Sequence, residues 1–196
     1  MNLKKLKVIS VFIVFIISFL CHFMYEWVPN FVTSIFFPVN ESIWEHMKIF
    51  FTAILICGLI ESFIIRKYKI QCNNHLFEVV LSSVISIPIY LIIYLPLYKI
   101  FGEVMFVSIS LMFLVYVFLA FVQYKFLTYR DLKVNKYILI GVVIMGYVIF
   151  GHIIQYIVIC FLILLKRNMV FSEAAEKLRN LMKLKILVFF IFHSYS

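Results

Sequence analysis

The side chains of this chain that could do chemistry are concentrated in residues 38–48, within a sequence made mostly of Ile, Phe, Leu and Val. The ionisable members of this segment are Glu41, Glu45, His46 and Lys48. Upstream, Ser18, His22 and Glu26 follow at i, i+4 and i+8, which places them on one face of a helix. Partly buried carboxylates beside histidine and lysine can change charge near neutral pH and can bind ions or small polar solutes.

These residues define two overlapping candidate sites. The candidates for binding a small polar ligand are Glu41, Trp44, Glu45, His46, Lys48, Tyr90 and Tyr94. The candidates for holding a divalent metal ion, the one cofactor that these residue types suggest, are His22, Glu26 and Glu45. Imidazole nitrogens and carboxylate oxygens are usual ligands of zinc. However, no HExxH motif occurs, and the adjacent Glu45 and His46 would point about 100° apart on a helix.

Each candidate also has a purely structural interpretation. Glu45 and Lys48 could form only an i,i+3 ion pair at the membrane interface, worth a few tenths of a kcal/mol. Trp44 could be an interfacial anchor. His22 with Glu26 could be a hydrogen-bonding pair between helices.

The elements that must position these residues are membrane-spanning helices. The 196-residue chain is 65% hydrophobic and only 14% charged, whereas a soluble domain is about 25% charged. Continuous apolar runs without strand-like alternation predict an all-α integral membrane bundle of about five helices. The predicted spans of this single domain (1–165) are residues 8–28, 41–65, 76–98, 104–124 and 137–165. Asn40 is expected to cap the second helix with Glu41 in its first turn, and Gly141, Gly146 and Gly151 to allow close approach of the fifth.

Loop charges predict the orientation of the bundle. Segments 1–7, 66–69 and 125–136 are basic and alternate with segments nearly free of Lys and Arg, so the N-terminus should be cytoplasmic in a multi-pass protein of the cell membrane. In this orientation the polar residues predict a pocket open to the outside and an inner half that is almost purely aliphatic and aromatic. Glu61 should pair with a basic loop residue. The net charge of +9 is spread over loops, which favours the lipid bilayer as partner over nucleic acid.

A short pattern links the chain to a family. Asn40, Glu41, Ser42, Trp44, Glu45, His46 and Lys48 fit NES-x-WEH-x-K. On this pattern residues 8–150 resemble a family of bacterial integral membrane proteins of unknown function. Members of that family continue to a segment ending near Tyr-Gly-Ile, which this chain lacks. The resemblance therefore implies a change of reading frame near Gly151. As it stands, the basic tail 166–196 predicts an amphipathic helix at Ser172–Lys185 that lies on a membrane surface.

Three functions fit these features. The first, which we favour, is a polytopic membrane protein with an outward-facing polar pocket for a small solute, ion or proton. The second is a membrane-embedded, metal-dependent hydrolase that acts on a lipid-like substrate. The third is a non-catalytic accessory membrane protein. The sequence has no Walker motif, GxSxG or CxxC, which argues against a kinase, an ATPase or an α/β-hydrolase.

Overall fold

The computed structural model describes residues 1–102 and 104–150, and within them every regular element is an α-helix. The helices are α1 (Leu3–Trp27), α2 (Phe31–Phe36), α3 (Ile43–Tyr68), α4 (His75–Phe101), α5 (Met105–Thr128) and α6 (Lys136–Phe150). Helices α1, α3, α4 and α5 are each long and apolar enough to cross a membrane, and α6 is a shorter apolar helix within the described range. The predicted all-α membrane fold is therefore confirmed.

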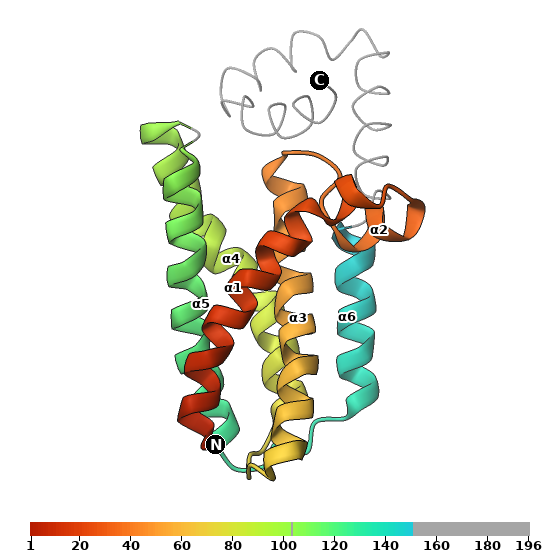
Figure 1. The fold of residues 1–196 in the computed structure, drawn as a ribbon, viewed down its shortest axis with the longest axis vertical. Helices are drawn as coiled ribbons and strands as arrows, with labels where there is room; N and C mark the ends of the chain where they lie inside the picture. The colour runs from red at the N-terminus through yellow and green to blue at the C-terminus, as the bar shows by residue number, and fades with distance from the viewer. Residues whose placement is uncertain (103, 151–196) are drawn as a thin grey trace, which may run out of the picture.

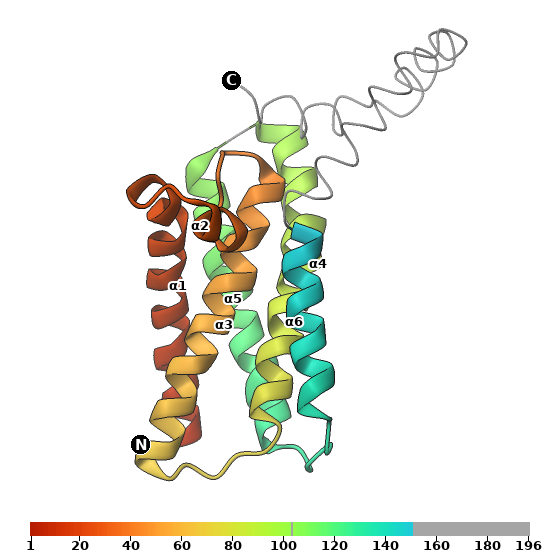
Figure 2. The ribbon, with the colours of Figure 1, turned by 90° about the vertical axis from the view of Figure 1, so that its right-hand side faces the viewer.

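The four long helices form a closed ring. α1 packs against α3 and α5, and α4 packs against the same two helices from the other side. α6 lies outside this ring against α3 and α4 (Figure 2). Large apolar side chains such as Met47 and Phe50 are buried on the inner side of the ring. Many apolar side chains on the outer faces of the helices are exposed, as expected where lipid replaces water.

The chain reverses direction at each connection, so its loops gather at two ends. The N-terminus, the α3–α4 loop and the α5–α6 loop lie at one end, and α2 lies at the other (Figure 1). The three basic segments are thus at the same end, as the predicted orientation requires. Asn74 joins two of these loops: its side-chain amide donates to the carbonyl oxygens of Phe126 at 3.1 Å and Arg130 at 2.9 Å.

Helix α3 begins later than the sequence predicted. Its N-cap is Ser42, whose hydroxyl accepts a hydrogen bond from the backbone N–H of Glu45 at 3.2 Å. Asn40 instead accepts from the backbone N–H of Ser42 at 3.0 Å. This is a local Asx-type turn, which competes with capping because the same side-chain oxygen serves both. Glu41 consequently lies in the turn before the helix and not in its first turn.

The glycines of α6 differ in how closely a neighbouring helix approaches them. A side chain at Gly146 would collide with the ring of Phe51, so this glycine lets α6 approach α3, as predicted. No residue in ranges 1–102 and 104–150 lies within 4 Å of a Cβ atom placed on Gly141, so for this part of the chain the same prediction is wrong there. Gly151 lies outside the described residues, as does the rest of the predicted 137–165 span.

Candidate functional site

Residues 38–48 have two separate roles in the fold, and the first is structural. Glu45 and Lys48 form an ion pair of 2.8 Å in which both side chains are completely buried. The same Glu45 oxygen accepts from the backbone N–H of Val39 at 3.0 Å, and the Lys48 ammonium donates to the carbonyl oxygen of Ser34 at 3.0 Å. The pair therefore fastens α2 and the turn after it to α3. Breaking a buried pair of this kind costs about 3–5 kcal/mol, far more than a surface pair contributes.

The second role is to line a cavity of about 410 Å³ between α1, α3, α4 and α5, which we call the outer cavity. Its polar lining comprises Ser18, His22, Glu41, His46, Tyr90, Tyr94 and Ser108. The remaining lining is apolar, with Phe19, Phe50 and Met112 among its members. The Glu41 side chain is 67% exposed and lies at the mouth. Ser18, one helical turn further into the bundle than His22, is buried.

His22, Glu41 and His46 converge at this mouth. The two oxygens of the Glu41 carboxylate face one imidazole each: Oε1 lies 3.8 Å from His22 Nε2, and Oε2 lies 3.3 Å from His46 Nε2. One potential ligand atom from each of the three residues lies within 4.8 Å of the others. The hydrogen bond with His46 is the main cause of the lowered pKa of the Glu41 carboxyl group, and it outweighs the opposing effect of partial burial.

The other nitrogen of His46 is already engaged. Nδ1 lies 2.8 Å from the backbone carbonyl oxygen of Ser42. Because a carbonyl oxygen can only accept, Nδ1 is the donor of this hydrogen bond. Nε2 therefore faces Glu41 and donates to its carboxylate when the ring carries a second proton. Histidines that bind metals commonly have this arrangement, in which a backbone carbonyl fixes the tautomer and the ring orientation.

The structure brings together some of the predicted ligand-binding residues and separates others. Tyr90 and Tyr94 line the outer cavity with stacked rings whose centroids are 5.0 Å apart. Trp44 does not line it and packs instead on Phe150 of α6, with ring centroids 5.4 Å apart.

The predicted metal set is also regrouped. Of His22, Glu26 and Glu45, only His22 lies at the converging group. Glu45 points to α2 and is held by Lys48, while Glu26 is exposed beyond the cavity. Glu41 and His46 complete the converging group instead of Glu26 and Glu45. The sequence predicted that adjacent positions 45 and 46 would diverge, but the direction that each takes depends on how α3 is rotated in the bundle.

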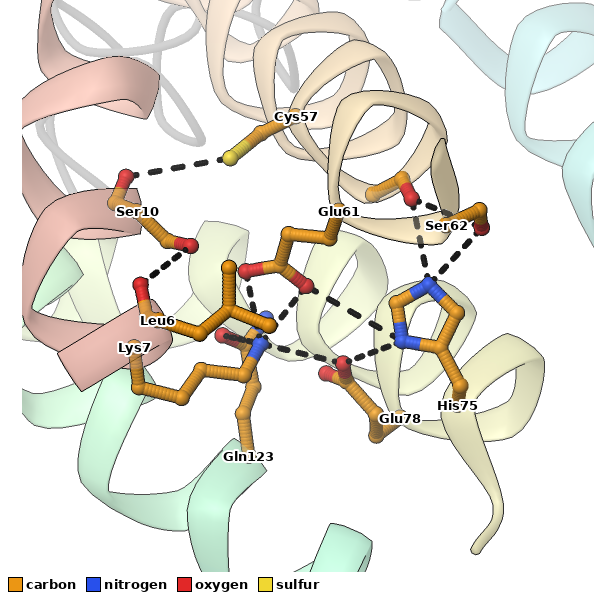
Figure 3. Close-up of polar contacts among 10 residues, drawn as sticks. Leu6, Lys7, Ser10, Cys57, Glu61, Ser62, His75, Glu78 and Gln123 are labelled. Atoms are coloured by element: carbon orange, nitrogen blue, oxygen red, sulfur yellow. Dashed lines mark hydrogen bonds and ion pairs between the residues drawn. The ribbon is translucent and has the colours of Figure 1, made fainter. Parts of the chain in front are cut away.

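A second polar group occupies the opposite half of the bundle, where an almost purely aliphatic and aromatic interior was predicted. That prediction is wrong. We call this group the inner cluster, and its members are Lys7 of α1, Glu61 of α3, His75 and Glu78 of α4, and Gln123 of α5 (Figure 3). The Lys7 ammonium donates to both oxygens of Glu61 at 2.8 Å, to Glu78 Oε1 at 3.1 Å and to Gln123 Oε1 at 3.0 Å. Lys7, Glu61 and Glu78 are all buried.

The cluster explains one prediction and goes beyond it. Glu61 pairs with a basic residue, as expected, but this residue, Lys7, is buried in helix α1 and does not lie in a loop. Glu78 adds a second carboxylate whose Oε2 is buried and has no hydrogen-bond partner among the described residues. His75 Nδ1 lies 3.2 Å from Glu78 Oε1, and its Nε2 lies 2.9 Å from the Ser62 hydroxyl.

Glu61, His75 and Glu78 are of residue types that bind metal ions, and one ligand atom from each lies within 4.8 Å of the others. The ammonium of Lys7 already occupies the space between the two carboxylates and supplies a positive charge there. A divalent cation would have to displace that charge. The mouth of the outer cavity contains no such competing cation among the described residues that line it.

A sequence signal for the inner cluster did exist. Glu78 follows His75 by three residues, so both lie on one helix face, close to the start of a predicted span. Lys7 was assigned to the basic segment at the N-terminus, although α1 begins at Leu3. The residues of the predicted tail, 166–196, and the reading-frame change expected near Gly151 lie outside the described residues.

Comparison with protein families gives one match. A family of unknown function, DUF6512, matches residues 1–169, which include every described helix and the whole of the 40–48 motif. No curated protein matches the chain, and no solved structure matches it.

Proposed function

The chain belongs to the DUF6512 family of unknown function, and we propose that it is a membrane-embedded binding protein whose outer cavity faces away from the cytoplasm. Its ligand-binding end is the group His22, Glu41 and His46, and the ligand that suits this group best is a divalent transition-metal ion of the zinc class. The rest of the cavity, which is largely apolar with tyrosine and serine hydroxyls, would admit a small amphipathic solute beside the ion.

The observation that carries the proposal is the convergence of three ligand types from different parts of the chain. Two imidazoles and one carboxylate within 4.8 Å form a His₂Glu set, and zinc sites with three protein ligands leave a fourth position for water or a solute. The carbonyl of Ser42 orients His46 for this role. The side chains are only partly exposed, 25% for His22 and 30% for His46, so the two rings are held in place by their surroundings.

Binding is favoured over hydrolysis for a specific reason. A metal-dependent hydrolase needs a general base in addition to the metal ligands. Among the described residues that line the outer cavity, the carboxylate is that of Glu41, which the proposal already uses as a ligand. Glu45, the other acid of the motif, is held by Lys48 and Val39 away from the cavity.

The test is a metal titration of the full chain in mild detergent. After removal of bound metal with a chelator, wild-type protein should bind one Zn²⁺ or Co²⁺ per chain, measured by calorimetry and by the visible spectrum of cobalt. His46→Ala and Glu41→Gln should lose this binding. Glu26→Gln is the matched control, because Glu26 lies one turn beyond His22 but outside the converging group, and it should bind as the wild type does.

Two results would contradict the proposal. One is a wild-type protein that binds no metal. The other is binding that survives His46→Ala and Glu41→Gln but disappears in His75→Ala, which would move the ion to the inner cluster.

A further inference from the structure

The outer cavity ends at a hydrogen bond that separates it from a second cavity. Ser18 lines the outer cavity, and its hydroxyl lies 2.7 Å from the hydroxyl of Tyr116. Tyr116 in turn lines a smaller cavity of about 20 Å³ on the side of the inner cluster. Both side chains are almost completely buried, 1% exposed for Ser18 and 2% for Tyr116. These two hydroxyls therefore form the polar connection between the halves of the bundle.

The smaller cavity continues this connection. Its lining includes Ser10, Tyr116, Gln123 and Glu61, which is a member of the inner cluster. Its volume is enough for one water molecule, and a buried water needs two to four polar partners. The lining residues supply hydroxyls, an amide and a carboxylate, so this cavity can hold a water molecule between Tyr116 and the inner cluster.

The inner cluster is suited to receive a proton. Facing one another are the ammonium of Lys7 from α1, the carboxylates of Glu61 from α3 and Glu78 from α4, and the imidazole of His75 from α4; Gln123 of α5 is neutral. With the ammonium charged and both carboxylates ionised, the group carries a net charge of −1. A buried charge that lacks a partner is costly, and one proton on Glu78 or on His75 neutralises the cluster. The unpartnered oxygen of Glu78 is a place for that proton.

The inner cluster is also connected to water, through His75. His75 is the first residue of α4, its side chain is 18% exposed, and it lies at the end of the bundle that carries the N-terminus and the basic loops. Nδ1 of His75 lies 3.2 Å from Glu78 and 3.9 Å from Glu61. A proton held by Glu78 is thus within reach of a residue whose side chain is partly exposed.

We infer that Ser18, Tyr116, Glu61, Glu78 and His75 form a proton pathway through the bundle, which joins the outer cavity to the opposite membrane surface. Each hydroxyl on the route accepts one proton and releases the proton it carried, so Ser18 and Tyr116 return to their neutral form. At the inner cluster the proton is taken up by a carboxylate, passed to His75 and released to water. The pathway requires the outer cavity as an entrance but does not require a metal ion at its mouth.

The test uses conservative variants that remove one hydroxyl. Tyr116→Phe keeps the ring, which packs on Phe50 with centroids 5.4 Å apart, and removes only the hydroxyl. Tyr147→Phe is the matched control, because the Tyr147 hydroxyl also has a hydrogen bond, 3.1 Å to Thr52, but lies on α6 and off the route. Ser18→Ala removes the other hydroxyl of the Ser18–Tyr116 hydrogen bond. It replaces Tyr116→Phe in the test if that variant lowers the yield of folded protein.

The full chain is reconstituted into vesicles that contain a pH-sensitive dye, and a potassium gradient with valinomycin drives protons across the membrane. Wild type and Tyr147→Phe should carry protons faster than protein-free vesicles. Tyr116→Phe, Ser18→Ala and Glu61→Gln should fall to the rate of protein-free vesicles. The inference is overturned if wild type is no faster than protein-free vesicles, if Tyr116→Phe equals wild type, or if Tyr147→Phe is as slow as Tyr116→Phe.

The same samples keep this inference separate from the proposed function. Tyr116 is not part of the His22–Glu41–His46 group, so Tyr116→Phe should bind Zn²⁺ as wild type does. Wild-type protein that carries protons but binds no Zn²⁺ would contradict the proposed function and leave the pathway standing. The metal-binding proposal and the proton-pathway inference can therefore be contradicted independently.

Discussion

The inner cluster allows the sharpest prediction about stability, and the perturbation is Lys7→Met. Methionine preserves most of the volume and the apolar stem of lysine but removes its charge. The substitution leaves the carboxylates of Glu61 and Glu78 facing one another in a buried site. Removing one partner of a buried ion pair costs about 3–5 kcal/mol. With about 2–4 °C of midpoint per kcal/mol for a chain of this size, the expected loss is on the order of 10 °C.

The two glutamates should respond unequally. Glu61 receives two hydrogen bonds from Lys7, whereas Glu78 receives one, and no residue in the described part of the chain bonds to its Oε2. Each single variant leaves one ammonium with one carboxylate, but Glu78→Gln keeps both hydrogen bonds from Lys7 to Glu61, so it should cost less than Glu61→Gln. In the double variant Lys7→Met/Glu61→Gln, loss of one repelling carboxylate should recover about 0.5–3 kcal/mol relative to additivity.

Unfolding can be followed with a dye that becomes fluorescent on reaction with thiols. Cys21 and Cys57 are buried and become reactive only when the bundle opens. Lys5→Met is the control, because Lys5 lies on the same helix but is exposed, and its midpoint should match that of the wild type. The reasoning fails if Lys7→Met behaves like Lys5→Met, or if the effects of Lys7→Met and Glu61→Gln simply add.

The remaining predictions concern a helix contact and the mouth of the outer cavity. A Cβ atom at Gly58 would collide with the side chain of Val79. Gly58→Ala should therefore lower the stability by about 1–3 kcal/mol through overpacking, and Val79→Ala should partly restore it. Gly141→Ala, whose new Cβ atom meets no described residue, should change the unfolding midpoint little in the same thermal assay. The pKa of the Glu41 carboxyl is lowered in the folded protein. The ionised group therefore stabilises the fold at any pH above the ordinary pKa of a glutamate, and this stabilisation is lost as the pH falls through the lowered pKa. In the presence of a chelator, the unfolding midpoints of wild type and Glu41→Gln should thus converge below that pKa; a gap that widens toward low pH would contradict this sign. The difference should be small, because the side chain is 67% exposed.

Much of the architecture follows from composition and from the order of apolar and basic segments. A chain that is 65% hydrophobic cannot bury all its apolar surface within itself, and lipid forces every spanning segment to be helical. Lys and Arg in alternate loops then gather at one end, since successive spanning helices run in opposite directions. The 38–48 motif was recognisable because ionisable residues stand out in an apolar sequence.

The partners of those residues depended on the tertiary structure. Lys7 reaches Glu61 and Glu78 across separations of 54 and 71 residues, which no local pattern encodes. Hydropathy assigns each of these charges to the end of a span, whereas burial depends on how each helix is rotated and on what its neighbours offer. Rotation of α3 likewise sends Glu45 to Lys48 and the α2 segment, and sends the adjacent His46 to Glu41 and His22. The sequence by itself therefore determined that the chain is a helical membrane protein with a charged motif at one end, because these properties follow from local composition. Only the packed bundle decided that the motif is divided between a structural ion pair and a ligand group, and that a second charged cluster lies at the opposite end, because both depend on contacts between helices far apart in the chain.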